Sequence, residues 1–109
     1  MITEITAQKA YDSLNKDEAI LIDVREQDEY EQWHIKEATL APLSNLPAAM
    51  QQINLPKDKK IIIHCLKGGR SAEAILYLHE NILKDYDVYN LAGGILAWQE
   101  DGLPINTST

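Results

Sequence analysis

Largely apolar runs mark where strands are expected in this chain. Two of them occupy residues 19–24 and 60–65, and neither shows the polar alternation of a half-exposed strand. Such runs are typical of strands that are buried on both faces of a parallel sheet. Shorter runs at 39–41, where Pro42 stops the pattern, and at 88–91 are expected to be two further strands.

Segments with helical patterns separate these strands. Thr6 is a suitable N-cap for a helix that closes near residues 15–17, because apolar residues follow it at the i, i+3, i+4, i+7 spacing. A polar, acidic helix is expected at 26–33. Another helix, capped by Ser44 or Asn45, is expected next, and its apolar face comprises Leu46, Ala49, Met50 and Ile53.

The longest helix is expected at residues 70–83. Its apolar stripe comprises Ala72, Ile75, Leu76, His79, Ile82 and Leu83. Gly93 and Gly94 then open a last helix that runs through Trp98. Strands that alternate with helices in this way indicate an α/β fold with a parallel sheet.

The length of 109 residues suits a single domain. We assign this domain to residues 1–105 and expect residues 106–109 to form a polar, flexible C-terminal tail. In parallel sheets of α/β proteins, ligands bind beyond the carboxyl ends of the strands. Cys65 lies at such an end.

Composition and charge argue against several classes of protein. The 17 acidic and 10 basic side chains give a net charge of −7, which disfavours binding to nucleic acid, where Lys and Arg supply most of the affinity. No apolar stretch approaches the roughly 20 residues of a membrane span, and the N-terminus has no secretory pattern. The single cysteine cannot form an internal disulfide. We therefore expect a cytoplasmic protein with neither a membrane nor a nucleic-acid partner.

The segment HCLKGGRS at residues 64–71 is the part of the sequence that predicts chemistry. It contains the only cysteine, Cys65, two adjacent glycines, and the cations Lys67 and Arg70, with no acid. Cys65 is either a buried, inert thiol, the commoner fate of a free cysteine, or a nucleophile in an anion-binding cradle. The basic, glycine-rich setting before a helix favours the nucleophile.

A nucleophilic role requires Cys65 to be a thiolate. A free thiol has a pKa near 8.5, so a dominant thiolate at neutral pH requires a lowering of about two units, or roughly 2.7 kcal/mol. A helix N-terminus supplies only about 0.3–1 kcal/mol. Gly68 and Gly69 would let several backbone N–H groups turn inward, and Lys67 and Arg70 would add positive charge. Together these contributions can reach the required lowering.

No histidine is well placed to act as a base for the cysteine. His64 precedes it in a strand, where neighbouring side chains point to opposite faces. His79 falls on the expected apolar stripe and is interpreted as a core residue, whereas the position of His34 indicates no role. No spacing typical of a metal site involves these histidines, so we expect neither a metal nor a cofactor. Glu29 and Glu31 are interpreted as parts of a solvated helix face.

Three ordered motifs resemble those of rhodanese domains, the sulfurtransferase fold family. The second motif, Cys65-x-x-Gly68-x-Arg70-Ser71, is similar to the active-site loop of the family. The first motif comprises residues 21–25, 29–30 and 34–35, and the third comprises residues 90–98 and 102–104. The resemblance covers roughly residues 3–105.

This resemblance implies a three-layer fold with the cysteine at the base of a cradle of backbone N–H groups. Cys65 would carry sulfane sulfur as a persulfide, taken from thiosulfate or from a small-molecule or protein persulfide and passed to a thiol or to cyanide. Asp23 and Arg25 would have structural roles. The substrate would bind to the loop residues Leu66, Lys67, Gly68, Gly69, Arg70 and Ser71.

Two alternatives to sulfur transfer remain open at this stage. The first alternative is a phosphatase. The spacing Cys-x4-Arg from Cys65 to Arg70 argues against it, because this length is associated with sulfurtransferases, whereas the related phosphatases have one residue more. The other alternative is a rhodanese-like module that binds or regulates a partner without turnover, although many such modules lack the cysteine. The sequence also departs from the family at Trp33, where glycine is usual, and at residues 36–37, where Pro-Gly is usual.

Overall fold

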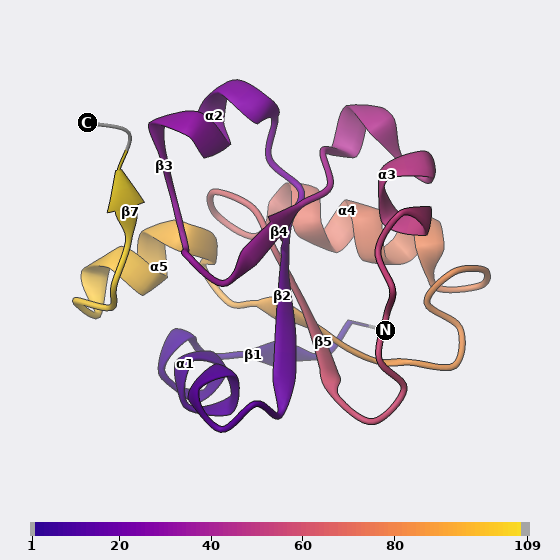
Figure 1. Cartoon of the computed structure of the whole chain (residues 1–109), viewed down its shortest axis with the longest axis horizontal. Coiled ribbons are helices and arrows are strands. Elements are labelled where there is room, and N and C mark those ends of the chain that lie inside the picture. The colour runs from indigo at the N-terminus through magenta and orange to yellow at the C-terminus, as the bar shows by residue number, and fades with distance from the viewer. Residues whose placement is uncertain (1, 108–109) are drawn as a thin grey trace.

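The computed structural model describes residues 2–107, and its centre is a five-stranded sheet (Figure 1). The strands are β1 (Glu4–Ile5), β2 (Ala19–Asp23), β4 (Ala38–Leu40), β5 (Lys60–His64) and β6 (Asp87–Leu91). They lie in the order β1-β6-β5-β2-β4, and every pairing is parallel. The predicted α/β fold is therefore confirmed. Because Asp23 pairs with His64, the segments that follow β2 and β5 leave the sheet at the same end.

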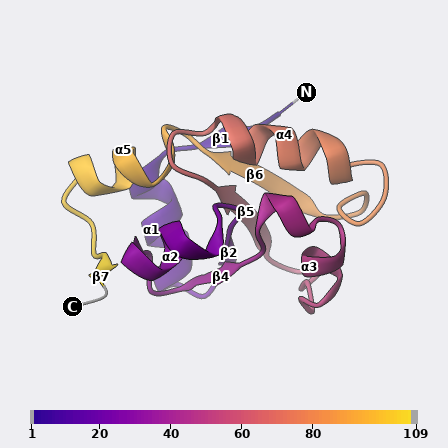
Figure 2. The same ribbon diagram turned by 90° about the horizontal axis from the view of Figure 1, so that it is seen from above.

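Helices cover both faces of this sheet, which makes three layers (Figure 2). On one face lie α1 (Ala7–Asn15) and α5 (Gly94–Glu100), and on the other lie α3 (Ala48–Gln51) and α4 (Gly69–Leu78). The short helix α2 (Gln27–Gln32) lies beyond the carboxyl end of β2 (Figure 1). Within the described residues, no helix combines the length and the apolar character needed to cross a membrane.

Alternate side chains of the central strands pack into two separate cores. Leu21 of β2 and Ile62 of β5 face α1 and α5 and belong to the cluster that contains Trp98. Ile22 and Ile63, one residue further along each strand, face α3 and α4. All five side chains are almost completely buried, which stabilises the fold by about 1.5–3 kcal/mol for each aliphatic residue. Burial on both faces explains why these strands lack a polar alternation.

One predicted helix cap is confirmed and another is wrong. Thr6 caps α1, and its hydroxyl accepts the Lys9 N–H at 3.2 Å. The residues expected to cap the next helix, Ser44 and Asn45, instead lie in the 3-10 turn η1 (Leu43–Asn45), and α3 begins only after Pro47. The Ser44 backbone N–H and hydroxyl both bind the Glu26 carboxylate, so Ser44 is not available as a cap.

The longest helix is shorter than predicted, and its buried face is shifted by one residue. α4 ends at Leu78, and the next eight residues form turns before β6. Its buried residues are Ser71, Ala74, Ile75 and Leu78. Leu76 is 54% exposed, and the His79 side chain is 51% exposed beside Glu80. The interpretation of His79 as a core residue is therefore wrong.

A small antiparallel pair joins two distant segments. β3 (Trp33–His34) pairs with β7 (Asn106–Thr107), so regular structure continues past the expected domain end at residue 105. The rest of the expected tail, residues 108–109, lies outside the described residues. Trp33 has an extended backbone with φ of −165°. It therefore carries none of the strain that a left-handed glycine position would impose on a large side chain.

Candidate active site

Cys65 lies directly after β5, and its side chain is only 1% exposed. The chain then turns sharply into α4, because Gly68 has a left-handed φ of +115° and acts as the N-cap of that helix. This turn directs the Gly68 N–H at the Cys65 Sγ, 3.1 Å away. Such a φ is readily accessible only to glycine, which explains why the sequence has Gly68 at this position.

Ser71 in the first turn of α4 provides a second polar contact to the sulfur. Its Oγ lies 3.4 Å from the Cys65 Sγ and 3.2 Å from the Gly68 carbonyl. The same Oγ is also within hydrogen-bond distance of Oδ1 of Asn90, a buried residue of β6, so the sulfur, the Gly68 carbonyl and this amide oxygen are alternative acceptors for its one proton. The Asn90 amide in turn donates to the Gly68 carbonyl at 3.1 Å. Asn90 thus links β6 to Gly68 and to the first turn of α4.

Asn90 was not among the site residues predicted from the sequence. It belongs to the third motif, which lies far from the cysteine in the sequence. The available signal was its position near the end of a parallel strand, since residues at the carboxyl ends of neighbouring strands lie close together. The β5–β6 pairing places Asn90 beside Ile63, two residues before Cys65.

The cradle stabilises the anionic form of the Cys65 thiol. Burial on its own raises the pKa of Cys65, but hydrogen bonds from the Ser71 hydroxyl and from the N–H groups of Ser71, Gly68 and Lys67 outweigh it. The pKa therefore lies below the ordinary value of a cysteine. Hydrogen bonds to the charged form favour that form directly. The contacts that lower the pKa of Cys65 are the Ser71 hydroxyl and the loop N–H groups. The pKa of the nearby Arg70 guanidinium is raised by its hydrogen bonds to Glu29, and the charge of Cys65 also helps to raise it.

The start of α5 holds the cysteine loop from the other side. The Ile95 N–H donates to the Cys65 carbonyl at 3.0 Å, and the Leu96 N–H donates to the Leu66 carbonyl at 3.2 Å. Gly94 has a left-handed φ of +63°, and a Cβ atom on it would overlap the Leu66 carbonyl group. The Gly-Gly pair of the third motif therefore allows α5 to approach the backbone of the loop.

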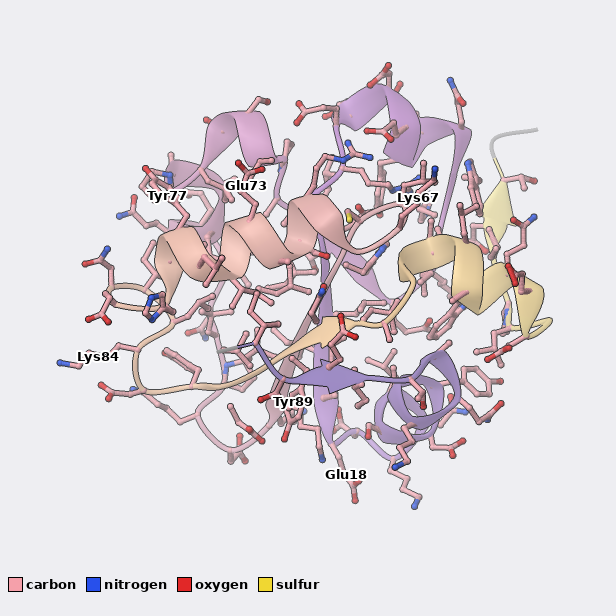
Figure 3. The ribbon with its side chains drawn as sticks, turned by 180° about the vertical axis from the view of Figure 1, so that it is seen from behind. Glu18, Lys67, Glu73, Tyr77, Lys84 and Tyr89 are labelled. Carbon is pink, nitrogen blue, oxygen red and sulfur yellow. The ribbon has the colours of Figure 1, made fainter. Side chains whose placement is uncertain are left out.

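The sulfur lies at the base of a shallow cavity of about 330 Å³. The walls are formed by the predicted loop residues Leu66, Lys67, Gly69 and Arg70 together with Cys65. Lys67 is exposed, and Figure 3 shows it near the beginnings of α4 and α5, at the opposite end of the molecule from Glu18. Within residues 2–107, Lys67 takes part in no ion pair.

Arg70 is not free at the mouth of this cavity, because Glu29 of α2 binds it through both carboxylate oxygens. The two N–O distances are 2.7 and 2.9 Å. The hydrogen bonds from Arg70 lower the pKa of Glu29 to about 2. The prediction of a solvated face therefore fails for Glu29, whereas Glu31 is exposed as expected. No local pattern indicates this pairing, since 41 residues separate the two partners.

A buried ion pair supports the strand that precedes α2. Arg25 and Asp23 are both fully buried, and the guanidinium binds the carboxylate with N–O distances of 2.9 to 3.2 Å. Arg25 also donates to the Trp33 carbonyl at 2.7 Å and lies over the Trp33 ring. These contacts connect β2 with β3 and do not involve the cysteine, which agrees with a structural role.

The histidines do not bind the cysteine sulfur in the described part of the chain. The Nδ1 atom of His64 lies 3.1 Å from the Cys65 carbonyl, and its Nε2 lies 3.6 Å from the Asp23 carboxylate. His34 stacks on Tyr30 at a ring distance of 4.0 Å. Among residues 2–107, no group of His, Cys, Asp and Glu side chains is arranged to hold a metal ion. The polar partners of the sulfur are therefore N–H groups and a hydroxyl.

This combination of fold, motifs and loop is shared with a known family. The family model described as the rhodanese-like domain matches residues 6–101. The chain belongs to the rhodanese-like domain family. A crystal structure of a rhodanese-related protein from Thermoplasma volcanium has a TM-score of 0.81 and 29% identity, and the match covers 95% of this chain and 97% of that one.

Relatives of this rhodanese-like chain carry two kinds of names. A protein of Allochromatium vinosum named sulfurtransferase is 36% identical, over 96% of this chain and 95% of its own length. The thiosulfate sulfurtransferase GlpE of Actinobacillus succinogenes is 32% identical, over 97% and 92%. A tRNA uridine(34) hydroxylase of Erwinia tasmaniensis is 33% identical over 84% of this chain, which spans only 28% of that enzyme. The full-length relatives support sulfurtransferase activity in general.

Proposed function

We propose that Cys65 carries sulfane sulfur between a donor and a thiophilic acceptor. The observation that supports this role is the position of its Sγ, which receives the Gly68 N–H at 3.1 Å at the base of a shallow cavity. A ring of N–H donors stabilises the attacking thiolate and then the negative charge of a persulfide. No side chain has to move a proton in either step, which fits a site without a histidine at the sulfur.

The first step loads the enzyme. The Cys65 thiolate attacks the outer sulfur of thiosulfate, a new S–S bond forms, and the bond to the sulfonate group breaks with its electron pair. The products are the Cys65 persulfide anion and sulfite, so charge and atoms balance. In the second step, cyanide or an acceptor thiolate attacks the terminal sulfur, and the Cys65 thiolate leaves.

The donor and the acceptor belong to this proposal as chemical classes. Thiosulfate is a candidate donor because one full-length relative is named for it. A small-molecule or protein persulfide presents the same outer sulfur, and a thiol is a suitable acceptor besides cyanide. A lone cysteine that must stay reduced fits a cytoplasmic setting.

Intact mass spectrometry tests the proposal directly. After incubation with thiosulfate, the protein should gain the mass of one sulfur atom, and cyanide should remove that mass and yield thiocyanate. The Cys65→Ser variant should show neither reaction, while hydrolysis of an aryl phosphate should be absent from both proteins. A folded wild-type protein that takes up no sulfur would instead indicate a binding or regulatory module.

A further inference from the structure

Two cationic side chains, Lys67 and Arg70, lie at the mouth of the cavity above the sulfur, and one of them is already in an ion pair. Lys67 is exposed and unpaired within residues 2–107, whereas Arg70 donates to both oxygens of Glu29 at 2.7 and 2.9 Å. The paired side chains are 35% and 30% exposed, so solvent reaches the pair without separating it. Bidentate contacts of this kind are the most specific that arginine forms with a carboxylate.

The orientation of Glu29 is fixed independently of Arg70. Glu26 caps α2, and its backbone N–H donates to Oε1 of Glu29 at 3.0 Å in a reciprocal capping box. Glu26 is in turn anchored because its carboxylate accepts the N–H and the hydroxyl of Ser44. The carboxylate of Glu29 is therefore presented to Arg70 by a preorganised helix start.

The Arg70–Glu29 ion pair reduces the positive charge that an anionic donor encounters at the mouth of the cavity. Both Arg70 and Cys65 line the same cavity, so an unpaired guanidinium would lie within reach of the charged end of a donor. Glu29 cancels that charge and leaves Lys67 as the net positive charge of the rim. A doubly charged donor loses more from this cancellation than a singly charged donor, because electrostatic attraction scales with the charge of the ligand.

We propose that Glu29 is a specificity-determining residue that disfavours dianionic sulfur donors and leaves the site to singly charged ones, namely persulfides and thiosulfonates. This inference rests on the proposed sulfur transfer and extends that proposal by naming the class of donor. Thiosulfate remains a substrate, but it must approach a rim with one net positive charge or displace Glu29 from Arg70.

The test compares Glu29→Gln with a matched control on the same helix. Glu31→Gln removes an equal charge from α2, but Glu31 is exposed, and among the described residues its carboxylate accepts a hydrogen bond only from the Gln27 side chain. The donors are thiosulfate, a dianion, and methanethiosulfonate, a monoanion with the same outer sulfur. Sulfate, a dianion with no transferable sulfur, is measured by its protection of Cys65 against iodoacetamide, which is uncharged.

Glu29→Gln should lower the KM for thiosulfate and the Kd for sulfate by up to about fivefold, the effect of one partly exposed ionic contact. The KM for methanethiosulfonate should fall only about twofold, since its single charge gains about half as much free energy. Glu31→Gln should leave all three constants close to the wild-type values. Adding Arg70→Gln to Glu29→Gln should abolish the gain, because the released guanidinium is its source.

The outcomes separate this inference from the function on which it rests. Equal effects of Glu29→Gln and Glu31→Gln, or a higher Kd for sulfate in Glu29→Gln than in the wild-type protein, would overturn the role of Glu29. If the wild-type protein takes sulfur from neither donor, the proposed function fails. The sulfate measurement still decides whether Glu29 restrains Arg70 in that case, because it needs no sulfur transfer.

Discussion

Gly94 at the start of α5 packs directly against the Leu66 carbonyl in the cysteine loop. Because a Cβ atom at this position would overlap that carbonyl group, Gly94→Ala should force α5 and the loop apart. We expect a loss of about 2–4 kcal/mol in the free energy of unfolding, from overpacking and left-handed strain together. Thiocyanate formation should fall more than tenfold, because the loop N–H groups would no longer converge on the sulfur.

Gly102 is the matched control for this substitution. Its φ of +72° resembles that of Gly94, but within residues 2–107 no atom other than those of its chain neighbours lies within 4 Å of a Cβ built on it. Gly102→Ala should therefore show the backbone strain alone, about 1 kcal/mol, with normal sulfur transfer. Equal activity of the two variants would contradict the importance of the close contact between α5 and the loop.

The two loop glycines should respond differently to alanine. Gly68 has a φ of +115°, which disfavours any side chain, whereas Gly69 is the first residue of α4 and has open space around it. Gly68→Ala should displace the N–H that binds the sulfur and slow the alkylation of Cys65 by iodoacetamide at neutral pH. Gly69→Ala should leave that rate near the wild-type value. The comparison fails if both variants lose reactivity equally.

Ser71→Ala should raise the pKa of Cys65. Burial opposes the thiolate, and the Ser71 hydroxyl is the foremost of the contacts that favour it, followed by the loop N–H groups. The fraction of thiolate increases as the pH rises through the pKa, so the pH profile of alkylation should shift to higher pH in the variant. Lys67→Gln is the control, since its exposed charge is screened and should move the profile much less. An unshifted Ser71→Ala profile would assign the effect to the backbone alone.

His64 should make the fold sensitive to mild acid. Burial lowers the pKa of His64, against an opposing effect of Asp23, so the unfolded state binds the proton more tightly. The stability from this residue is complete above the unfolded pKa of about 6.5 and is lost as the pH falls, by up to about 1.4 kcal/mol per pH unit. Urea unfolding between pH 7 and pH 5 should show this slope.

His64→Asn should flatten this dependence, and His79→Asn, at an exposed position, should keep it. The range from pH 7 to pH 5 lies above the titration of Glu29, whose pKa is lowered from 4.5 to about 2. The stabilising effect of Glu29 is therefore lost only at lower pH. A slope that persists in His64→Asn would mean that another group takes up the proton.

The sequence predicted the strands β2, β4, β5 and β6, the helix α1 and the position of the cysteine, because double-sided burial leaves a clear apolar signal. It did not predict β1, an edge strand of only two residues. The phase of α4 was missed for a functional reason. Its true buried face starts at Ser71, a polar residue that points at the cysteine and at Asn90, so the apolar pattern favoured the neighbouring face. Local rules of hydrophobic pattern are expected to fail where a residue serves the site.

Glu29 shows a second limit of reading the sequence alone. Its neighbours are polar, its helix has no buried residue, and its partner Arg70 lies in the first turn of the distant helix α4. Only the parallel sheet, which brings the segments after β2 and β5 to the same end, places Glu29 beside Arg70. The capping role attributed to Ser44 was lost in the same way, since Glu26 provides a tertiary partner for that side chain.

The N–H groups of the cysteine loop belong to the main chain, and this has an evolutionary consequence. The side chain of Leu66 is half-buried and that of Lys67 is exposed at the cavity wall, and neither has to hold the sulfur. Substituting either side chain would change which donor or acceptor binds, without changing the reactive sulfur atom. Reactivity and partner choice can therefore diverge independently on one scaffold, provided that the glycines keep the path of the backbone.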